Sequence, residues 1–246
     1  MAEGANPLEQ FAIHRIVTIH IGGIDASITN SAVAMVVAIV LVTLFLTLGM
    51  RRHALVPGRW QSLAEMSYEF VANMVRENSG HDGMRYFPFI FTLFMFILFC
   101  NLLGLIPYNF TPTSHIIVTF VMAMVVFIGV TVIGFARNGV GFLRLFAPSG
   151  VPVFLLPLIV VIEFISYLTR PISLSIRLFA NMMAGHTMLK VFAGFVVSLG
   201  ILAGWAPLAF VVALFGLELL IAFLQAYVFA ILACIYLNDA LNLHAH

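Results

Sequence analysis

The sequence predicts an all-α membrane protein with about five transmembrane helices and one amphipathic surface helix. Hydrophobic residues make up 63% of the 246 residues and charged residues only 9%, with a mean hydropathy of +1.12. Soluble domains carry roughly 25% charged residues, and a chain of this size could not hide so much apolar surface from water. Several uncharged stretches are also long enough to cross a hydrocarbon core of about 30 Å as helices. We therefore expect a single integral membrane domain over residues 1–246.

The first part of the chain predicts a polar segment, a span and a surface helix. Residues 1–29 are polar to mixed. Residues 31–50 carry no charge and are long enough for the first span, which ends at a group of basic residues. In residues 60–79, charged side chains fall on one helical face and Leu, Met and Phe side chains on another. That pattern is typical of an amphipathic helix lying on the membrane surface or packed on a neighbouring protein.

The middle of the chain predicts a hairpin of two spans at 86–106 and 115–136. The stretch from residue 86 to residue 136 contains no Asp, Glu, Lys or Arg. Pro107 and Pro112 supply a turn between the two apolar halves of this stretch.

The last part of the chain predicts long helices. Residues 151–202 are almost continuously apolar and would form roughly 78 Å of helix at ~1.5 Å per residue, more than twice the hydrocarbon core. Two interpretations remain open: two spans with a break near Arg170 and Pro171, or one long helix that is bent or strongly tilted. Residues 208–237 predict a last helix, which is also longer than a perpendicular crossing needs.

Charge also bears on orientation and partners. If the spans alternate simply, most arginines outside the apolar stretches fall on one side, whereas Arg15 falls opposite. Basic residues mark the cytoplasmic side, so we expect the N-terminus outside and the C-terminus in the cytoplasm. A net charge of +1 gives no indication of a nucleic-acid partner. Cys100 and Cys234 lie in apolar runs and are interpreted as small hydrophobic residues, and no metal site or cofactor is expected.

Charges inside the apolar stretches require an explanation, because each costs ~2.5–3.5 kcal/mol at the centre of a bilayer. Lys190 can reach the headgroups along its aliphatic stem. Glu163 and Arg170 are seven residues apart and lie near one helical face, so they are compatible with a structural pair or with an ion path. The charged residues between position 150 and the polar C-terminal tail are Glu163, Arg170, Arg177, Lys190 and Glu218.

Arg177 is the charge that most requires a function. Arginine keeps its proton at any realistic pH, and Arg177 shares a helical face with Asn181. A purely structural arginine would need a carboxylate nearby, for which Glu218 is one candidate. His186 follows Arg177 by nine residues and therefore points to the opposite face, where an imidazole can exchange protons near neutral pH.

Glu218 and Gln225 are seven residues apart and share one face of the last helix. A fixed cation, two groups that exchange protons and several amides and hydroxyls indicate a proton path with an electrostatic gate. The sequence contains no Ser/His/Asp triad, P-loop or dinucleotide-binding motif, so no catalytic residue is predicted.

The polar residues of the long apolar stretches belong to recognisable motifs. The run SIRLFANMMAGH at 175–186 strongly resembles a signature of subunit a of the membrane sector of rotary F-type ATP synthases. The last helix, with Glu218 and the run LQAYVF at 224–229, resembles the second signature of that family. The runs PISL at 171–174 and NLLGLIP at 101–107 also fit, and the resemblance covers most of residues 30–240.

The resemblance implies a stator that lies beside a rotating ring of c subunits, each with an essential carboxylate. Two offset half-channels would let a proton reach a ring carboxylate and leave it after rotation. Arg177 matches the arginine that faces the ring carboxylates and blocks leakage. Positions matching the proton path are Asn181, His186, Glu218 and Gln225, and those matching the other access route are Glu163 and Ser166.

The resemblance also implies a non-catalytic subunit without a cofactor, in contact with the c-ring, the b/b′ peripheral stalk, the rest of the F1Fo complex and lipid. It places the chain in a bacterial inner membrane or, alternatively, in the mitochondrial inner membrane, with its last two helices steeply tilted along the ring. Some members carry an acid where His186 stands and a histidine where Glu218 stands, and the exchange seen here is typical of mitochondrial and related alphaproteobacterial members. Gly104 stands where some members have an acid.

Two other functions are compatible with the buried charges. A self-contained secondary transporter would have its site around Glu163 and Arg170, although the sequence lacks the internal repeat of many such proteins. A non-conducting scaffold would use Arg177 only to hold helices together.

Overall fold

The computed structural model describes residues 15–18, 20–21, 24–25, 27–51, 57–106, 110–146 and 154–241. Residues 1–14 and 151–153, which the sequence assigns to the N-terminal segment and to the start of the long helix, lie outside the described residues. Five helical segments are long and apolar enough to cross a membrane, which confirms the prediction of a multi-pass, all-α membrane protein. They are Asn30–Gly49, Arg59–Gly104, Ile116–Leu143, Leu156–Gly200 and Trp205–Leu241.

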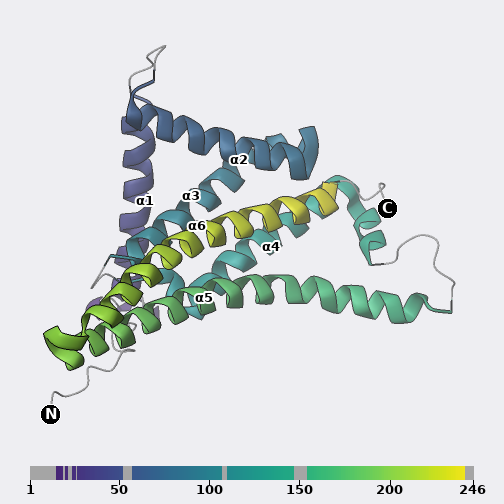
Figure 1. Ribbon diagram of the computed structural model, residues 1–246. Coiled ribbons are helices and arrows are strands. Elements are labelled where there is room, and N and C mark those ends of the chain that lie inside the picture. Colours follow the sequence, from purple (N-terminus) through teal and green to yellow (C-terminus); the bar gives the residue numbers. More distant parts are fainter. Residues whose placement is uncertain are drawn as a thin grey trace. The chain divides into compact units, whose positions relative to one another are not determined.

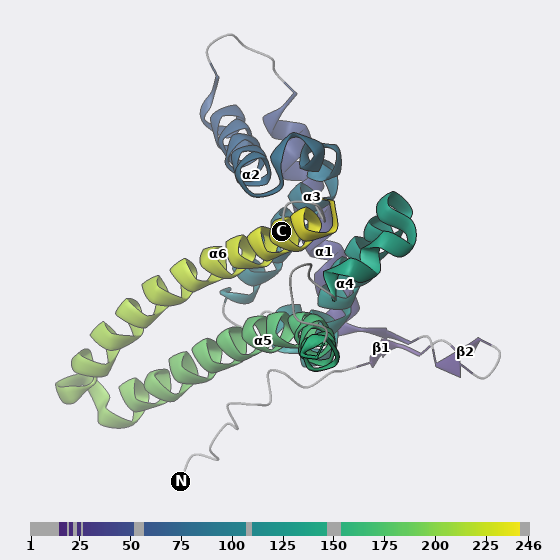
Figure 2. The same cartoon turned by 90° about the vertical axis from the view of Figure 1, so that its right-hand side faces the viewer.

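Four short strands precede the first helix. Strand β1 (Arg15–Val17) pairs antiparallel with β4 (Ile28–Thr29), and β2 (His20–Ile21) pairs antiparallel with β3 (Ile24–Asp25). Figure 2 shows β1 and β2 as arrows of the same hairpin. The sequence indicated only a mixed polar segment here, because strands of two or three residues leave no periodic pattern to recognise.

The chain divides into two compact units. The first contains residues 1–47, 95–118 and 178–226. It includes most of α1 (Asn30–Gly49), the second half of α3 (Phe87–Gly104) and the 3-10 helix η3 (Pro112–Ser114). In this unit Ala38 of α1 packs against Cys100 and Leu103 of α3, and all three are buried.

The second unit contains residues 48–94, 119–177 and 227–246. Its α2 (Arg59–Gly83) exposes Glu65 and Glu69 together with Leu63, Met66 and Phe70 of the predicted apolar face, and it buries Val71 and Val75. The unit also contains η2 (Met84–Tyr86) and η4 (Gly139–Leu145), together with α4 (Ile116–Asn138) from residue 119 onward.

Helix α5 (Leu156–Ala203) is one long element that runs through Pro171, and Figure 1 draws it as a single ribbon. The interpretation as two spans with a break near Pro171 is therefore wrong. A proline removes one backbone donor and crowds the preceding turn, but it does not have to end a helix whose faces are packed. The backbone leaves helical geometry only at Gly200, where φ is 65°.

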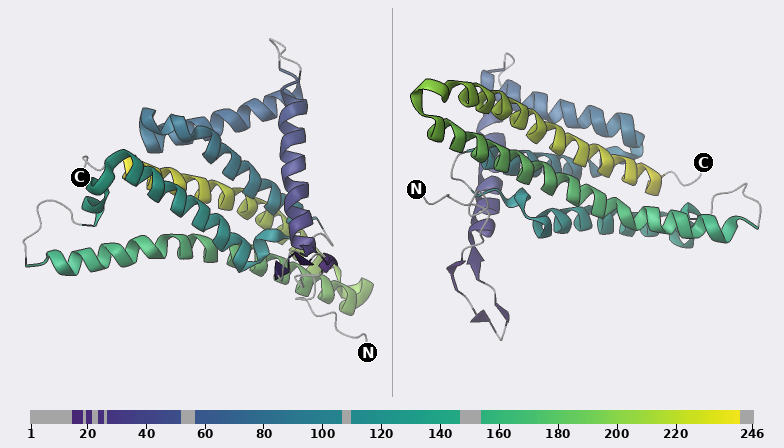
Figure 3. Two further views of the ribbon diagram at one scale, coloured as in Figure 1. Left: turned by 180° about the vertical axis from the view of Figure 1, so that it is seen from behind. Right: turned by 60° about the horizontal axis from the view of Figure 1, so that its bottom comes forward.

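Helix α6 (Trp205–Leu241) returns directly after α5. An ideal Cβ on Gly204 would lie 2.5 Å from the carbonyl oxygen of Gly200 and 2.8 Å from that of Val196, so this turn has no space for a side chain. Figure 3 shows the tight bend between the two helices. The ring centroids of Phe192 in α5 and Phe210 in α6 lie 4.6 Å apart, near the turn. The two helices therefore pack antiparallel within the first unit.

Candidate functional site

A buried imidazole–carboxylate pair joins α5 and α6 in the first unit. His186 of α5 is 8% exposed and Glu218 of α6 is 3% exposed. Nδ1 of His186 contacts Oε1 of Glu218, as an ion pair when the imidazole is protonated. Gly185 allows this approach, because an ideal Cβ there would lie 2.7 Å from Oε1 of Glu218. Two residues that the sequence places on different helices are thus in direct contact.

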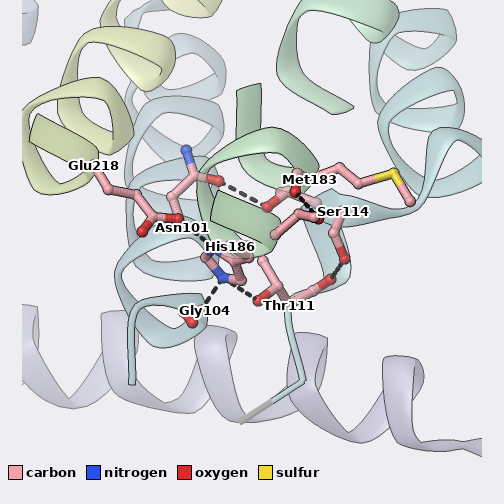
Figure 4. Close-up of polar contacts among 9 residues, drawn as sticks. Asn101, Gly104, Thr111, Ser114, Met183, His186 and Glu218 are labelled. Carbon is pink, nitrogen blue, oxygen red and sulfur yellow. Dashed lines mark hydrogen bonds and ion pairs between the residues drawn. The ribbon is translucent and has the colours of Figure 1, made fainter. Parts of the chain in front are cut away.

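The other ring nitrogen of His186 is also held. Nε2 lies 2.9 Å from the carbonyl oxygen of Gly104, at the end of α3, and 2.9 Å from Oγ1 of Thr111, next to η3. Figure 4 shows the imidazole between these two oxygens, with Glu218 approaching from α6. Contacts on both nitrogens fix the position and the orientation of the ring.

A network of amides and hydroxyls continues from this pair. Asn101 of α3 and Thr113 of η3 are fully buried, and the Thr113 hydroxyl donates to Oδ1 of Asn101 at 2.8 Å. Nδ2 of Asn101 donates to the carbonyl oxygen of Ala222 in α6 at 3.2 Å. The hydroxyl of Ser114 donates to the carbonyl oxygen of Thr111 at 2.6 Å. A continuous polar region therefore reaches α3, η3, α5 and α6 inside an otherwise apolar unit.

Sequence reasoning missed most of this network. The segment from Pro107 to Pro112 predicts only a turn. Thr111 lies within it, and Thr113 and Ser114 come directly after it, without any helical or strand periodicity. Asn101 is the available signal, because it is an amide in a long apolar run and a buried amide needs partners.

Asn181 and Gln225 form a second polar contact between α5 and α6. Nδ2 of Asn181 donates to Oε1 of Gln225 at 2.9 Å. Gln225 is 3% exposed, and its Nε2 has no hydrogen-bond partner among the described residues. Oε2 of Glu218 is likewise buried and without a partner there. One buried donor and one buried acceptor on α6 are thus available for water or protons.

Arg177 belongs to the second unit. Its side chain is exposed, and it makes no hydrogen bond or ion pair with any part of the chain that the structure describes. Glu218, which the sequence offers as a structural partner for Arg177, contacts His186 within the first unit.

Arg170 forms an ion pair with a residue of the polar C-terminal part of the chain. Nη1 of Arg170 lies 3.0 Å from Oδ2 of Asp239, near the end of α6. The Arg170 guanidinium also lies 4.8 Å from the ring centroid of Tyr236 and 5.5 Å from that of Tyr167. The suggested pairing of Arg170 with Glu163 is therefore wrong. Residues seven apart on one helix are separated by ~10.5 Å along its axis, and a second helix supplies a closer carboxylate.

Glu163 and Ser166 also lie in the second unit, two turns and one turn before Arg170 on α5. Glu163 is half-buried and Ser166 is exposed. Among the described residues, the Glu163 carboxylate has no hydrogen bond or ion pair, and Ser166 accepts a hydrogen bond at its backbone carbonyl from Thr169.

The predicted site residues therefore fall into two groups, each on α5 and α6. The first unit holds the buried pair His186–Glu218 and the contact between the exposed Asn181 and the buried Gln225. The second unit holds the exposed Arg177 and the half-buried Glu163. Such groups can bind, hold and release protons, and an unpaired cation can attract a mobile carboxylate.

Comparisons with known proteins give a consistent result. Residues 32–238 match the family described as ATP synthase A chain. The chain is 61% identical over 240 residues to the ATP synthase subunit a of Pelagibacter ubique, covering 97% of this chain and 98% of that one. It is 60% identical over 244 residues to the subunit a of Parvibaculum lavamentivorans (96% and 94% covered) and 55% identical over 239 residues to that of Rhodospirillum rubrum (97% and 99% covered). The chain therefore belongs to the family of ATP synthase subunit a, in the form found in alphaproteobacteria.

Proposed function

We propose that the chain is the proton-conducting stator subunit of the ATP synthase membrane sector, and that it couples proton flow to rotation of a c-ring. The observation that carries the proposal is Arg177. It is a permanent cation in a helix long and apolar enough to cross a membrane, and it is exposed and makes no hydrogen bond or ion pair with the described residues. A charge at the centre of a bilayer costs ~2.5–3.5 kcal/mol, so a carboxylate on another chain is the partner that explains it.

The polar pairs of the first unit supply the groups of one half-channel. His186 and Glu218 form an acid–base pair, and Asn181 and Gln225 lie further along α5 and α6. Glu163 and Ser166 line the second half-channel. Moving one proton charge through 100 mV yields ~2.3 kcal/mol, which is too little for one ATP, so a rotating ring has to collect several protons. The subunit itself then needs neither a nucleotide site nor a catalytic residue.

Orientation and partners follow from the same proposal. The N-terminus lies outside and the C-terminus in the cytoplasm of a bacterial inner membrane, α5 and α6 are tilted along the ring, and the b/b′ peripheral stalk contacts the chain outside the ring interface. A secondary transporter is less well supported, because Arg170 of its suggested site is neutralised by Asp239.

The test replaces Arg177 by Ala in the complete ATP synthase and measures ATP-driven proton pumping in inverted membrane vesicles. We expect pumping to fall to background although the complex assembles, because ring carboxylates lose their electrostatic partner. Arg85→Ala is the matched control, since Arg85 is an exposed arginine of η2 and its removal should leave pumping unchanged. Pumping retained in Arg177→Ala would refute the proposal, and coupling retained in Arg177→Met would favour a non-conducting scaffold.

A further inference from the structure

A carbonyl oxygen determines which nitrogen of His186 carries a proton. The Gly104 carbonyl can only accept a hydrogen bond, and it lies 2.9 Å from Nε2 of His186. Nε2 must therefore be an N–H group, since a bare nitrogen would place two acceptors against each other. The Thr111 hydroxyl oxygen, also 2.9 Å from Nε2, can accept from the same N–H.

With Nε2 protonated, only one state of the His186–Glu218 pair is both neutral and hydrogen-bonded. Without a proton between Nδ1 and Oε1, two acceptors face each other and the buried pair carries one negative charge. With both Nδ1 and the carboxyl group protonated, the pair carries one positive charge. A single proton between Nδ1 and Oε1 satisfies the contact and leaves no net charge. Since both side chains are more than nine-tenths buried, the charged states are the costly ones.

We propose, on the basis of the function proposed above, that Gly104 and Thr111 are positioning residues that lock His186 with its proton on Nε2. His186 and Glu218 then bind one proton as a single neutral unit. Mobile protons exchange at Glu218 and are not relayed across the imidazole. His186 thus keeps the carboxyl group of Glu218 in position, and it does not pass protons from one of its nitrogens to the other.

The exchange takes place at Oε2 of Glu218. This atom is buried and has no hydrogen-bond partner among the described residues, whereas Oε1 is engaged by His186. A proton that arrives at the negatively charged pair forms one O–H bond at Oε2 and makes the pair neutral, and its release breaks the same bond, while Nε2 keeps its hydrogen throughout. A relay would instead require Nε2 to give up its proton and then to face the Gly104 carbonyl as a bare acceptor.

The first test measures the protonation of the ring directly. Complete ATP synthase is labelled with 15N-histidine in membranes and examined by solid-state NMR, and the His186 signals are identified by their loss in His186→Gln. We expect Nε2 to remain protonated in resting membranes and during ATP-driven pumping. A bare Nε2 in either condition would overturn the proposal. Because this readout does not depend on the pumping rate, its failure is distinct from a failure of the Arg177→Ala test.

The second test distinguishes a positioning role of His186 from a role in proton transfer. Thr111→Val removes one of two acceptors at Nε2, so we expect pumping to fall only about twofold to tenfold, the loss that corresponds to one net hydrogen bond. Thr111→Ser keeps the hydroxyl and should restore pumping. Thr43→Val is the matched control, because the exposed Thr43 hydroxyl bonds only its own helix at the Ile39 carbonyl. Complete loss in Thr111→Val, an unchanged rate in Thr111→Val, or no recovery in Thr111→Ser would each overturn the proposal.

Discussion

Gly185→Ala is the substitution that tests the His186–Glu218 pair most directly. An ideal Cβ on Gly185 would lie 2.7 Å from Oε1, 3.0 Å from Cδ and 3.3 Å from Cγ of Glu218, distances at which one of the groups has to move. The backbones of α5 and α6 are held by neighbouring contacts, whereas the Glu218 carboxyl group can rotate. The added methyl group should therefore displace the carboxyl group from Nδ1 of His186.

The magnitude follows from the contact that is lost. A hydrogen bond that involves a charged group contributes about 1.5–3 kcal/mol, and each 1.36 kcal/mol corresponds to a tenfold change in rate. We therefore expect ATP-driven pumping to fall about 10- to 150-fold. Assembly should be unaffected, because replacing a glycine inside a helix by alanine favours the helix by about 1 kcal/mol.

Gly194→Ala supplies the control on the same helix. An ideal Cβ on Gly194 meets no atom within 4 Å, so this variant receives the same gain in helix propensity without a clash. Pumping is measured in inverted vesicles and divided by the amount of assembled complex. Equal rates for Gly185→Ala and Gly194→Ala would show that the close approach of Gly185 to Glu218 does not affect pumping, and the reasoning would then be wrong.

Two further predictions concern stability. Asp239→Asn leaves the Arg170 guanidinium without its anion, and since both side chains are about three-quarters buried, the loss should approach the ~3–5 kcal/mol of a broken buried pair. The double variant Arg170→Met/Asp239→Leu should recover most of that loss, as measured by the thermal dissociation of the purified complex, and a double variant as unstable as the single one would contradict this. Thr113→Val leaves Oδ1 of the fully buried Asn101 without its donor and should cost about 1–3 kcal/mol in the same assay, whereas an unchanged midpoint would mean that water replaces the hydroxyl.

The length and composition of the apolar stretches are sufficient to predict the helices, because a bilayer leaves few ways to satisfy a backbone. The continuity of α5 through Pro171 is not predictable in this way. The penalty of one proline is local, and whether it ends the helix depends on packing along both sides. Likewise the chain turns at Gly200, within the stretch 151–202 that predicts continuous helix, because a positive φ at one glycine is sufficient to change the direction of the chain.

Contacts between side chains of different helices are the part of the site that cannot be predicted from the spacing of residues in the sequence. Periodicity places Arg170 and Glu163 on one face, but it cannot reveal that Asp239, 69 residues later, is the nearer charge. It predicts that His186 shares α5 with Arg177 on the opposite face, but not that Gly104 and Thr111 hold the ring. These contacts depend on which helix packs against which, and apolar composition is nearly the same in all of them.

Burial separates the polar groups of α5 by what they can do. His186 is buried and has partners on both ring nitrogens, whereas Arg177 is exposed and unpaired within the described chain. A buried neutral pair can keep a proton available without leaving a charge in an apolar environment. An exposed cation on the same helix cannot titrate, so it can only act on a charge that comes to it. The proposed function therefore gives the two kinds of group complementary roles: Glu218 would exchange the proton, and Arg177 would ensure that a ring carboxylate reaches its position without one.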